Sequence, residues 1–217
     1  SKPITKFSYQ LKNPNEIRYV LEKACYLAKS GRPGPVLIDI PMNFQKVKIK
    51  EKKLKRFKIP KKNSDNLLLK QNIKKIVNSL KNSSRPVVLL GGGIKISKTQ
   101  SKIRTFLNKL NIPVVTTWSG VDLIDHDYIN YIGNIGVYGS RAANFAVQNS
   151  DFLLTLGSRL DTRITGGAPN TFARNAKVIS VDIDKNELSK KRGLNLYLKI
   201  NSNLVEFFEV FNKVNFT

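Results

Sequence analysis

Glycines, hydroxyl side chains and charged side chains that could bind a ligand follow four short apolar stretches of this 217-residue chain. Each stretch predicts a buried strand, and in parallel α/β sheets ligands bind beyond the carboxyl ends of the strands. The candidate residues are Gly91, Gly92 and Gly93 after RPVVLL, Thr116 and Thr117 in IPVVTT, Gly157, Ser158, Arg159, Asp161 and Arg163 after DFLLTL, Asp182 at the end of AKVISVD, and Gly139 in GVYG.

This set of residue types suits a nucleotide. Glycines let backbone N–H groups approach a phosphate closely, and an arginine supplies the counter-charge. Asp182 could accept hydrogen bonds from ribose hydroxyls. Structural alternatives stay open, because a triple glycine can be a plain tight turn, both arginines could pair with surface acids, and GGGIKIS does not match the spaced-glycine fingerprint of nicotinamide enzymes. Asp184 is the better helix cap, which leaves Asp182 as the better ligand.

The elements that would position these residues alternate regularly. From about Asp65 to Phe216, short all-apolar strands alternate with amphipathic helices, including one near 98–111 and one capped by Ser140, while the segment between IPVVTTWSG and GVYG is expected to be a loop. This alternation predicts an α/β, doubly wound, Rossmann-like parallel sheet with helices on both faces.

A different unit precedes this domain. Asn13 is a helix cap, Pro14 takes the first helical position, and Gly31 ends the helix before the short strand VLID, which is expected to be buried. Cys25 falls on the apolar side of this helix, so we expect it to be inert packing in a reducing, cytoplasmic compartment. The GRPGP turn before the strand indicates a helix, tight turn and strand whose purpose the local sequence does not reveal.

The formal net charge of +23 is the strongest compositional feature. Lysines that neutralise phosphates could bind nucleic acid, so a basic nucleic-acid-binding module is a third hypothesis. However, the lysines are scattered over every helix, and the one dense run lies at 46–64, where a linker is expected. We therefore do not expect a nucleic-acid partner. No apolar run is long enough to span a bilayer, and the first ten residues lack the apolar segment of a signal peptide.

Several of these stretches together resemble a known family. SGRPGPVLIDIP, RPVVLLGGG, IPVVTTWSG, GNIGVYGSRAANFAVQNSDFLLTLGSRLDTRITG and AKVISVDIDKNEL are similar, in order, to segments of thiamine-diphosphate-dependent enzymes, above all the large catalytic subunit of acetolactate synthase. The resemblance implies that residues 1–45 end a pyrimidine-binding domain, that 46–64 form a basic linker, and that 65–217 form a central domain that often holds FAD. It also implies thiamine diphosphate and magnesium, bound mainly outside this segment, and a role in branched-chain amino-acid biosynthesis.

Site residues carry over by position. Those that fall on flavin-nucleotide contacts are Gly91, Gly92, Gly93, Thr116, Thr117, Gly157, Arg159, Asp161, Asp182 and Ile183. Arg163 falls on an arginine associated with the carboxylate of a 2-oxo acid substrate, and Lys6 matches a lysine near the mouth of the substrate channel. Guanidinium is apt for that role, because it binds a carboxylate bidentately.

The chain also departs from the family pattern. A flavin-contacting Met-His pair is Val137-Tyr138 here, the residue after Asp161 is Thr162 instead of a second acid, and a late Gly-Asp-Val contact is Ile200-Asn201-Ser202. These departures leave ADP, or an empty crevice in a purely structural domain, as alternatives to FAD. The metal-binding GDG motif and the activating glutamate of the family are missing as well, so this polypeptide alone is expected to be inactive, with no catalytic residue of its own. The implied partners are 2-oxo acids, further copies in a homodimer or homotetramer, and a regulatory subunit.

Overall fold

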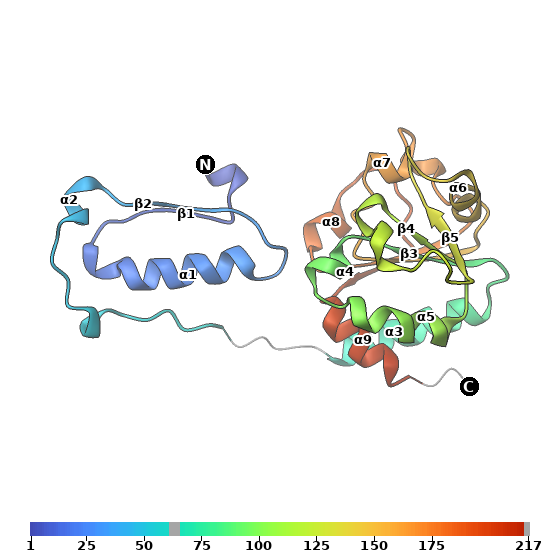
Figure 1. The fold of residues 1–217 in the computed structure, drawn as a ribbon, viewed down its shortest axis with the longest axis horizontal. Coiled ribbons are helices and arrows are strands. Elements are labelled where there is room, and N and C mark those ends of the chain that lie inside the picture. Colours follow the sequence, from blue (N-terminus) through green and yellow to red (C-terminus); the bar gives the residue numbers. More distant parts are fainter. Residues whose placement is uncertain (61–65, 215–217) are drawn as a thin grey trace. The chain divides into compact units, whose positions relative to one another are not determined.

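The chain forms two compact units, Ser1–Ser64 and Asp65–Thr217, and the computed structural model describes residues 1–60 and 66–214 (Figure 1). The finer division into a domain tail ending at residue 45 and a linker over 46–64 stays a prediction. Among the described residues, no helix is long and apolar enough to cross a membrane.

The first unit is a parallel strand pair with one long helix. Strand β1 (Phe7–Gln10) pairs with β2 (Val36–Asp39), and helix α1 (Ile17–Lys29) connects them; the helix α2 (Met42–Gln45) follows. As predicted, the Asn13 side chain caps the helical segment that begins at Pro14, here a 3-10 turn leading into α1, and Gly31 follows α1 with φ +59°. Strand β1 was not predicted.

Burial in the first unit is lower than the sequence suggested. Val20 and Ala24 of α1 are buried, but Leu21 is 44% exposed and Cys25 is exposed. The expectation that Cys25 is packed in an apolar environment is therefore wrong for this unit. Strand β2 is half-buried instead of buried, with Leu37 43% exposed: its side chains alternate between partly buried and exposed, and among the described residues α1 is the helix that packs on this strand pair.

The basic segment after α2 contacts the helix through one aromatic side chain. The Phe57 ring lies 5.6 Å from the Tyr19 ring and 5.5 Å from the Tyr26 ring, and its amide donates to Glu22 Oε2 at 2.7 Å. The hydrogen bond from Arg18, followed by that from the Phe57 amide, lowers the pKa of Glu22. Phe57 is thus attached to the α1 surface, with lysines on both sides of it in the sequence.

The second unit is built on a six-stranded sheet in which every pairing is parallel, with the order β5-β4-β3-β6-β7-β8. The strands are β3 (Pro86–Leu90), β4 (Val114–Thr116), β5 (Tyr131–Asn134), β6 (Phe152–Leu156), β7 (Lys177–Asp182) and β8 (Leu198–Asn201). The doubly wound α/β prediction is confirmed. The edge strand β5, however, lies where a loop was expected. A loop was expected because the sequence YIGN contains a glycine and an asparagine, which have low strand propensity.

Helices cover both faces of this sheet (Figure 1). Helices α3 (Asn66–Lys81), α5 (Ile103–Leu110) and α9 (Leu204–Asn212) pack one face, where Phe106, Phe207, Phe208 and Phe211 form an aromatic cluster. Helix α6 (Arg141–Gln148) covers the other face. The short helices α4 (Gly93–Ile96), α7 (Thr162–Thr165) and α8 (Lys185–Ser189) follow β3, β6 and β7. The cap predicted at Ser140 is confirmed, and any cap of α3 lies outside the described residues.

Asp151 joins two turns at the amino ends of β3 and β6. Its carboxylate accepts from the Ser83 hydroxyl, from the Ser84 amide at 2.8 Å and from the Arg85 amide at 3.0 Å. Burial acts to raise the pKa of Asp151, but these hydrogen bonds outweigh it, and the pKa lies below its usual value. The ionised carboxylate therefore stabilises this end of the sheet.

Candidate nucleotide site

The strand order reverses between β3 and β6, and their loops meet at that point. From β3 the chain continues to β4 and β5 on one side, while β6, β7 and β8 lie on the other. The Gly91 amide donates to Leu156 O at 2.9 Å and the Gly93 amide donates to Gly157 O at 2.9 Å. Such a switch point is the usual ligand crevice of an open α/β sheet.

The glycines at this point are required first by the protein's own packing. A Cβ on Gly91 would lie 2.3 Å from Gly157 O, and a Cβ on Gly93 would lie 2.7 Å from Gly157 Cα. Gly157 itself has φ +61°, which favours glycine. Of the amides of Gly91, Gly92 and Gly93, that of Gly92 alone makes no hydrogen bond to any described residue. A Cβ on Gly92 would meet Ser119 Cβ at 2.8 Å, so a valine there would disturb the fold as well as any ligand.

The two threonines at the end of β4 differ in the hydrogen bonding of their hydroxyl groups. Thr116 is fully buried, and its hydroxyl lies 3.0 Å from the Tyr131 hydroxyl of β5. The Thr117 amide donates to Leu90 O at 2.9 Å, and its hydroxyl makes no hydrogen bond within residues 1–60 and 66–214. Thr117 is thus the better candidate for donating a hydroxyl to a ligand.

A small pocket lies at the carboxyl ends of β6 and β7. Its volume is about 10 Å³, which is room for about one water molecule. It brings together Arg159 and Asp182, two of the residues predicted to bind a nucleotide. The lining residues are Ser158, Arg159, Leu160, Ser180, Asp182, Glu187, Leu188, Lys190, Arg192, Leu194 and Leu196.

Asp182 and Asp184 have separate roles at the end of β7. The Asp184 carboxylate accepts from the Asn186 amide at 2.9 Å and so caps α8, as predicted. Asp182 Oδ1 accepts from the Asp184 amide at 2.8 Å, and the Asn201 side chain donates to the carbonyls of Asp182 and Ile183 at 3.1 and 2.9 Å. These bonds fix the turn, with Asp182 on the pocket wall and Ile183 38% exposed.

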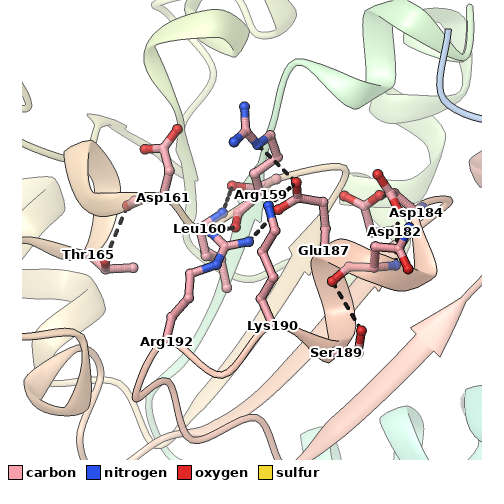
Figure 2. Close-up of polar contacts among 12 residues, drawn as sticks. Arg159, Leu160, Asp161, Thr165, Asp182, Asp184, Glu187, Ser189, Lys190 and Arg192 are labelled. Atoms are coloured by element: carbon pink, nitrogen blue, oxygen red, sulfur yellow. Dashed lines mark hydrogen bonds and ion pairs between the residues drawn. The ribbon is translucent and has the colours of Figure 1, made fainter. Parts of the chain in front are cut away.

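Glu187 of α8 was not singled out from the sequence, yet it organises the charges of this pocket (Figure 2). Its side chain is 7% exposed and contacts Arg159, Lys190 and Arg192. A signal was available: Glu187 lies three residues before Lys190, the spacing at which side chains on a helix meet. The partnership with Arg159, 28 positions away by number, is set by the neighbouring strands β6 and β7.

Asp161, Arg163 and Gly139 lie around α7. Asp161 Oδ1 accepts from the Arg163 amide at 3.1 Å, so Asp161 caps this short helix. The Arg163 side chain is exposed and makes no ion pair with any described residue, while its carbonyl accepts from the Val137 amide at 2.9 Å. Gly139 closes the Gly136 turn, where a Cβ would lie 2.5 Å from Ile135 C.

Lys6, a predicted substrate-binding residue, and Lys95 of α4 both donate hydrogen bonds to other residues of the protein. Lys6, in the first unit, donates from Nζ to Ser30 O at 2.5 Å and to Arg32 O at 2.9 Å, at the carboxyl end of α1, where a cation is favourable. Lys95 of α4 donates to Asp122 Oδ1 at 2.7 Å, and this hydrogen bond lowers the pKa of Asp122. The Lys6 contacts also explain Gly34, since a Cβ there would meet Lys6 Cδ at 3.0 Å.

Comparisons with known proteins agree with this architecture. Residues 73–206 match the family described as thiamine pyrophosphate enzyme, central domain. The chain is 35% identical over 188 residues to the acetolactate synthase large subunit of Lactococcus lactis, covering 87% of this chain and 32% of that protein. It is 38% identical over 192 residues to the large subunit of Porphyra purpurea, covering 88% and 32%. With the isozyme 2 large subunit of Escherichia coli it shares 34% identity over 195 residues, covering 90% and 35%. The chain thus spans about a third of the length of these relatives.

Proposed function

Because the chain belongs to the thiamine pyrophosphate enzymes, whose central domain it contains, we propose that it forms the nucleotide-binding middle part of an acetolactate synthase-like enzyme. The observation that carries this proposal is the similarity to acetolactate synthase large subunits over 87 to 90% of the chain. The enzyme would decarboxylate a 2-oxo acid and join it to a second oxo acid, and thiamine diphosphate would supply that chemistry. Following the family resemblance, we assign the magnesium and thiamine diphosphate sites mainly to parts of the protein outside this segment.

We assign the nucleotide to the carboxyl edge of the central sheet. Arg159, Lys190 and Arg192 supply positive charge for a diphosphate, and Asp182 lies on the same wall to accept hydrogen bonds from ribose or ribityl hydroxyls. The Gly92 amide and the Thr117 hydroxyl offer further donors. This set of donors and acceptors fits FAD chemically, and because the pocket has room for only about one water molecule, we place the nucleotide at its mouth, where the Arg159 side chain is 50% exposed.

Arg163 and Lys6 are our candidates for the substrate. The exposed Arg163 guanidinium has no ion-pair partner among the described residues and could bind the carboxylate of a 2-oxo acid bidentately. Lys6 Nζ donates hydrogen bonds to two backbone carbonyls in this structure. We therefore assign Lys6 an electrostatic contribution near the substrate instead of direct contact with it.

A second function is favoured by the side chains that depart from the family pattern. In this alternative the central domain is a scaffold with no nucleotide, or one that binds ADP. At the positions of the flavin-contacting Met-His pair that the family resemblance implies, this chain has Val137 and Tyr138, which are both exposed, and the Tyr138 ring lies 5.1 Å from the Trp118 ring.

The visible absorption spectrum of the purified full-length protein separates the two functions. A flavin band that persists after gel filtration supports the FAD-binding function. A protein without the band that nevertheless forms acetolactate from pyruvate supports the scaffold, and absence of acetolactate formation would count against the activity itself. Light scattering on the same sample tests the proposed homodimer or homotetramer, and a copurifying subunit would identify the regulatory partner.

A further inference from the structure

The Glu187 carboxylate contacts three cations from two parts of the chain (Figure 2). Lys190 Nζ lies 2.6 Å from Glu187 Oε1, Arg192 donates to Glu187 Oε2, and Arg159 Nε lies 3.6 Å from Glu187 Oε1. Arg159 follows β6, Glu187 belongs to α8, and the other two lie between α8 and β8. One carboxylate therefore connects the loop after β6 to the segment after α8.

A direct bond strengthens this connection. Arg192 NH1 donates to the backbone carbonyl of Arg159 at 3.0 Å, while its second terminal nitrogen contacts Glu187. Arg192 thus holds the backbone of Arg159, and Glu187 holds its guanidinium. The Arg192 side chain is 21% exposed, and the Arg159 side chain is 50% exposed. The Arg159 guanidinium can therefore contact Glu187 and still face a ligand.

The charge balance explains why a carboxylate is needed in a site for an anion. Three cations surround the Glu187 carboxylate, which is 7% exposed, and with the Asp182 carboxylate on the same pocket wall the net charge of the pocket is +1. Without the carboxylate the three cations would repel one another and turn toward solvent, because like charges are destabilising at short range. With it they stay together and still carry an excess of positive charge.

We propose that Glu187 is a positioning residue that aims Arg159 at the phosphates of a bound nucleotide and keeps Arg192 beside it. This inference rests on the proposed nucleotide-binding function. The ligand group is a phosphate or diphosphate, as in ADP or FAD, and Glu187 does not touch it.

The direction in which Glu187→Gln changes the nucleotide affinity distinguishes a positioning role of Glu187 from a purely electrostatic one. Glu187→Gln removes a negative charge from the pocket, so if Glu187 merely lowers the local positive potential, nucleotide should bind more tightly. If Glu187 positions Arg159, the same variant should bind ADP and FAD about tenfold more weakly, because a charge-assisted contact to phosphate is lost. Glu209→Gln is the matched control. Glu209 is 58% exposed, its carboxylate lies 3.6 Å from Lys102 Nζ, and neither residue lines the pocket.

The experiment is a calorimetric titration of ADP and FAD into the full-length protein and its variants, in a double-mutant cycle with Arg159→Ala. We expect Glu187→Gln to weaken binding in the parent and to have no further effect once Arg159 is alanine. Should Glu187→Gln not fold, Glu187→Asp keeps the charge but is too short to hold Arg159, and the same weakening is expected.

Unchanged or tighter binding in Glu187→Gln, or an equal loss with and without Arg159, would overturn the positioning role while leaving nucleotide binding intact. A parent protein that binds neither ADP nor FAD would overturn both proposals. The two failures are therefore distinguishable in one data set.

Discussion

Replacing Thr155 by valine should stabilise this protein, which is an unusual outcome for a core substitution. Thr155 lies in the middle of the central strand β6 and is fully buried. Among the described residues its hydroxyl is the one buried side-chain polar atom that makes no hydrogen bond. Valine has the same shape, so the substitution exchanges an unsatisfied hydroxyl for a methyl group without leaving a cavity.

The magnitude follows from the cost of that hydroxyl. A buried polar group without a partner costs about 1–3 kcal/mol. Residual hydrogen bonding in the native ensemble and imperfect packing reduce the gain, so we expect the free energy of unfolding to rise by about 1–2 kcal/mol. For a protein of this size that is an increase in Tm of about 2–8 °C.

Urea unfolding of the 217-residue chain, followed by far-UV circular dichroism, measures the effect. The midpoint should rise while the m-value stays constant. Thr99→Val is the matched control: Thr99 is also fully buried, but its hydroxyl lies 2.8 Å from Ser97 Oγ, so its loss should lower stability by about 1 kcal/mol. If Thr155→Val is destabilised to the same extent as Thr99→Val, the hydroxyl has a partner and the reasoning is refuted.

Further predictions concern the site, the first unit and pH. Asp182→Ala should weaken FAD or ADP binding about tenfold to a hundredfold in calorimetry, because a charge-assisted hydrogen bond is lost; equal affinity would remove Asp182 from the site. Arg163→Ala should leave nucleotide affinity unchanged but raise KM for the 2-oxo acid, and an unchanged KM would exclude the carboxylate role. Phe57→Ala should speed tryptic cleavage at residues 55–58, observed by mass spectrometry, because the anchor to α1 is gone; cleavage at the parental rate would contradict it. Asp151→Asn should lower the free energy of unfolding at neutral pH. Because the pKa of Asp151 is lowered in the folded state, the difference between parent and variant should be full above the unfolded pKa of about 3.9 and should vanish as pH falls through the folded pKa. A difference that does not change with pH would refute the assignment.

The fold of the second unit could be predicted because its strong signals are local. Four of the six strands are short, mainly apolar runs, and the caps Ser140 and Asp184 are single residues that act within a few positions. The edge strand β5 escaped prediction because Gly133 and Asn134 have low strand propensity, and its pairing with β4 is a tertiary property.

The candidate site was predictable only in part, since strand ends are visible in a sequence and their partners are not. The residues after β6 and β7 do line one pocket. The reason for the glycines at 91 and 93, which is contact with Gly157, depends on the neighbouring position of β3 and β6. The Glu187 contacts with Arg159 and the Phe57 contacts with α1 are likewise set by tertiary structure, so no sequence pattern indicated them.

Calorimetric titration of FAD and of ADP into the nucleotide-depleted full-length protein tests the central claim most directly. We predict saturable binding of one nucleotide per chain, with the affinity lowered by added salt, because Arg159 and Arg192 contribute charge to the site. No heat of binding with either nucleotide, in a protein that is folded and forms acetolactate, would contradict the nucleotide site and leave the structural scaffold as the function of this domain.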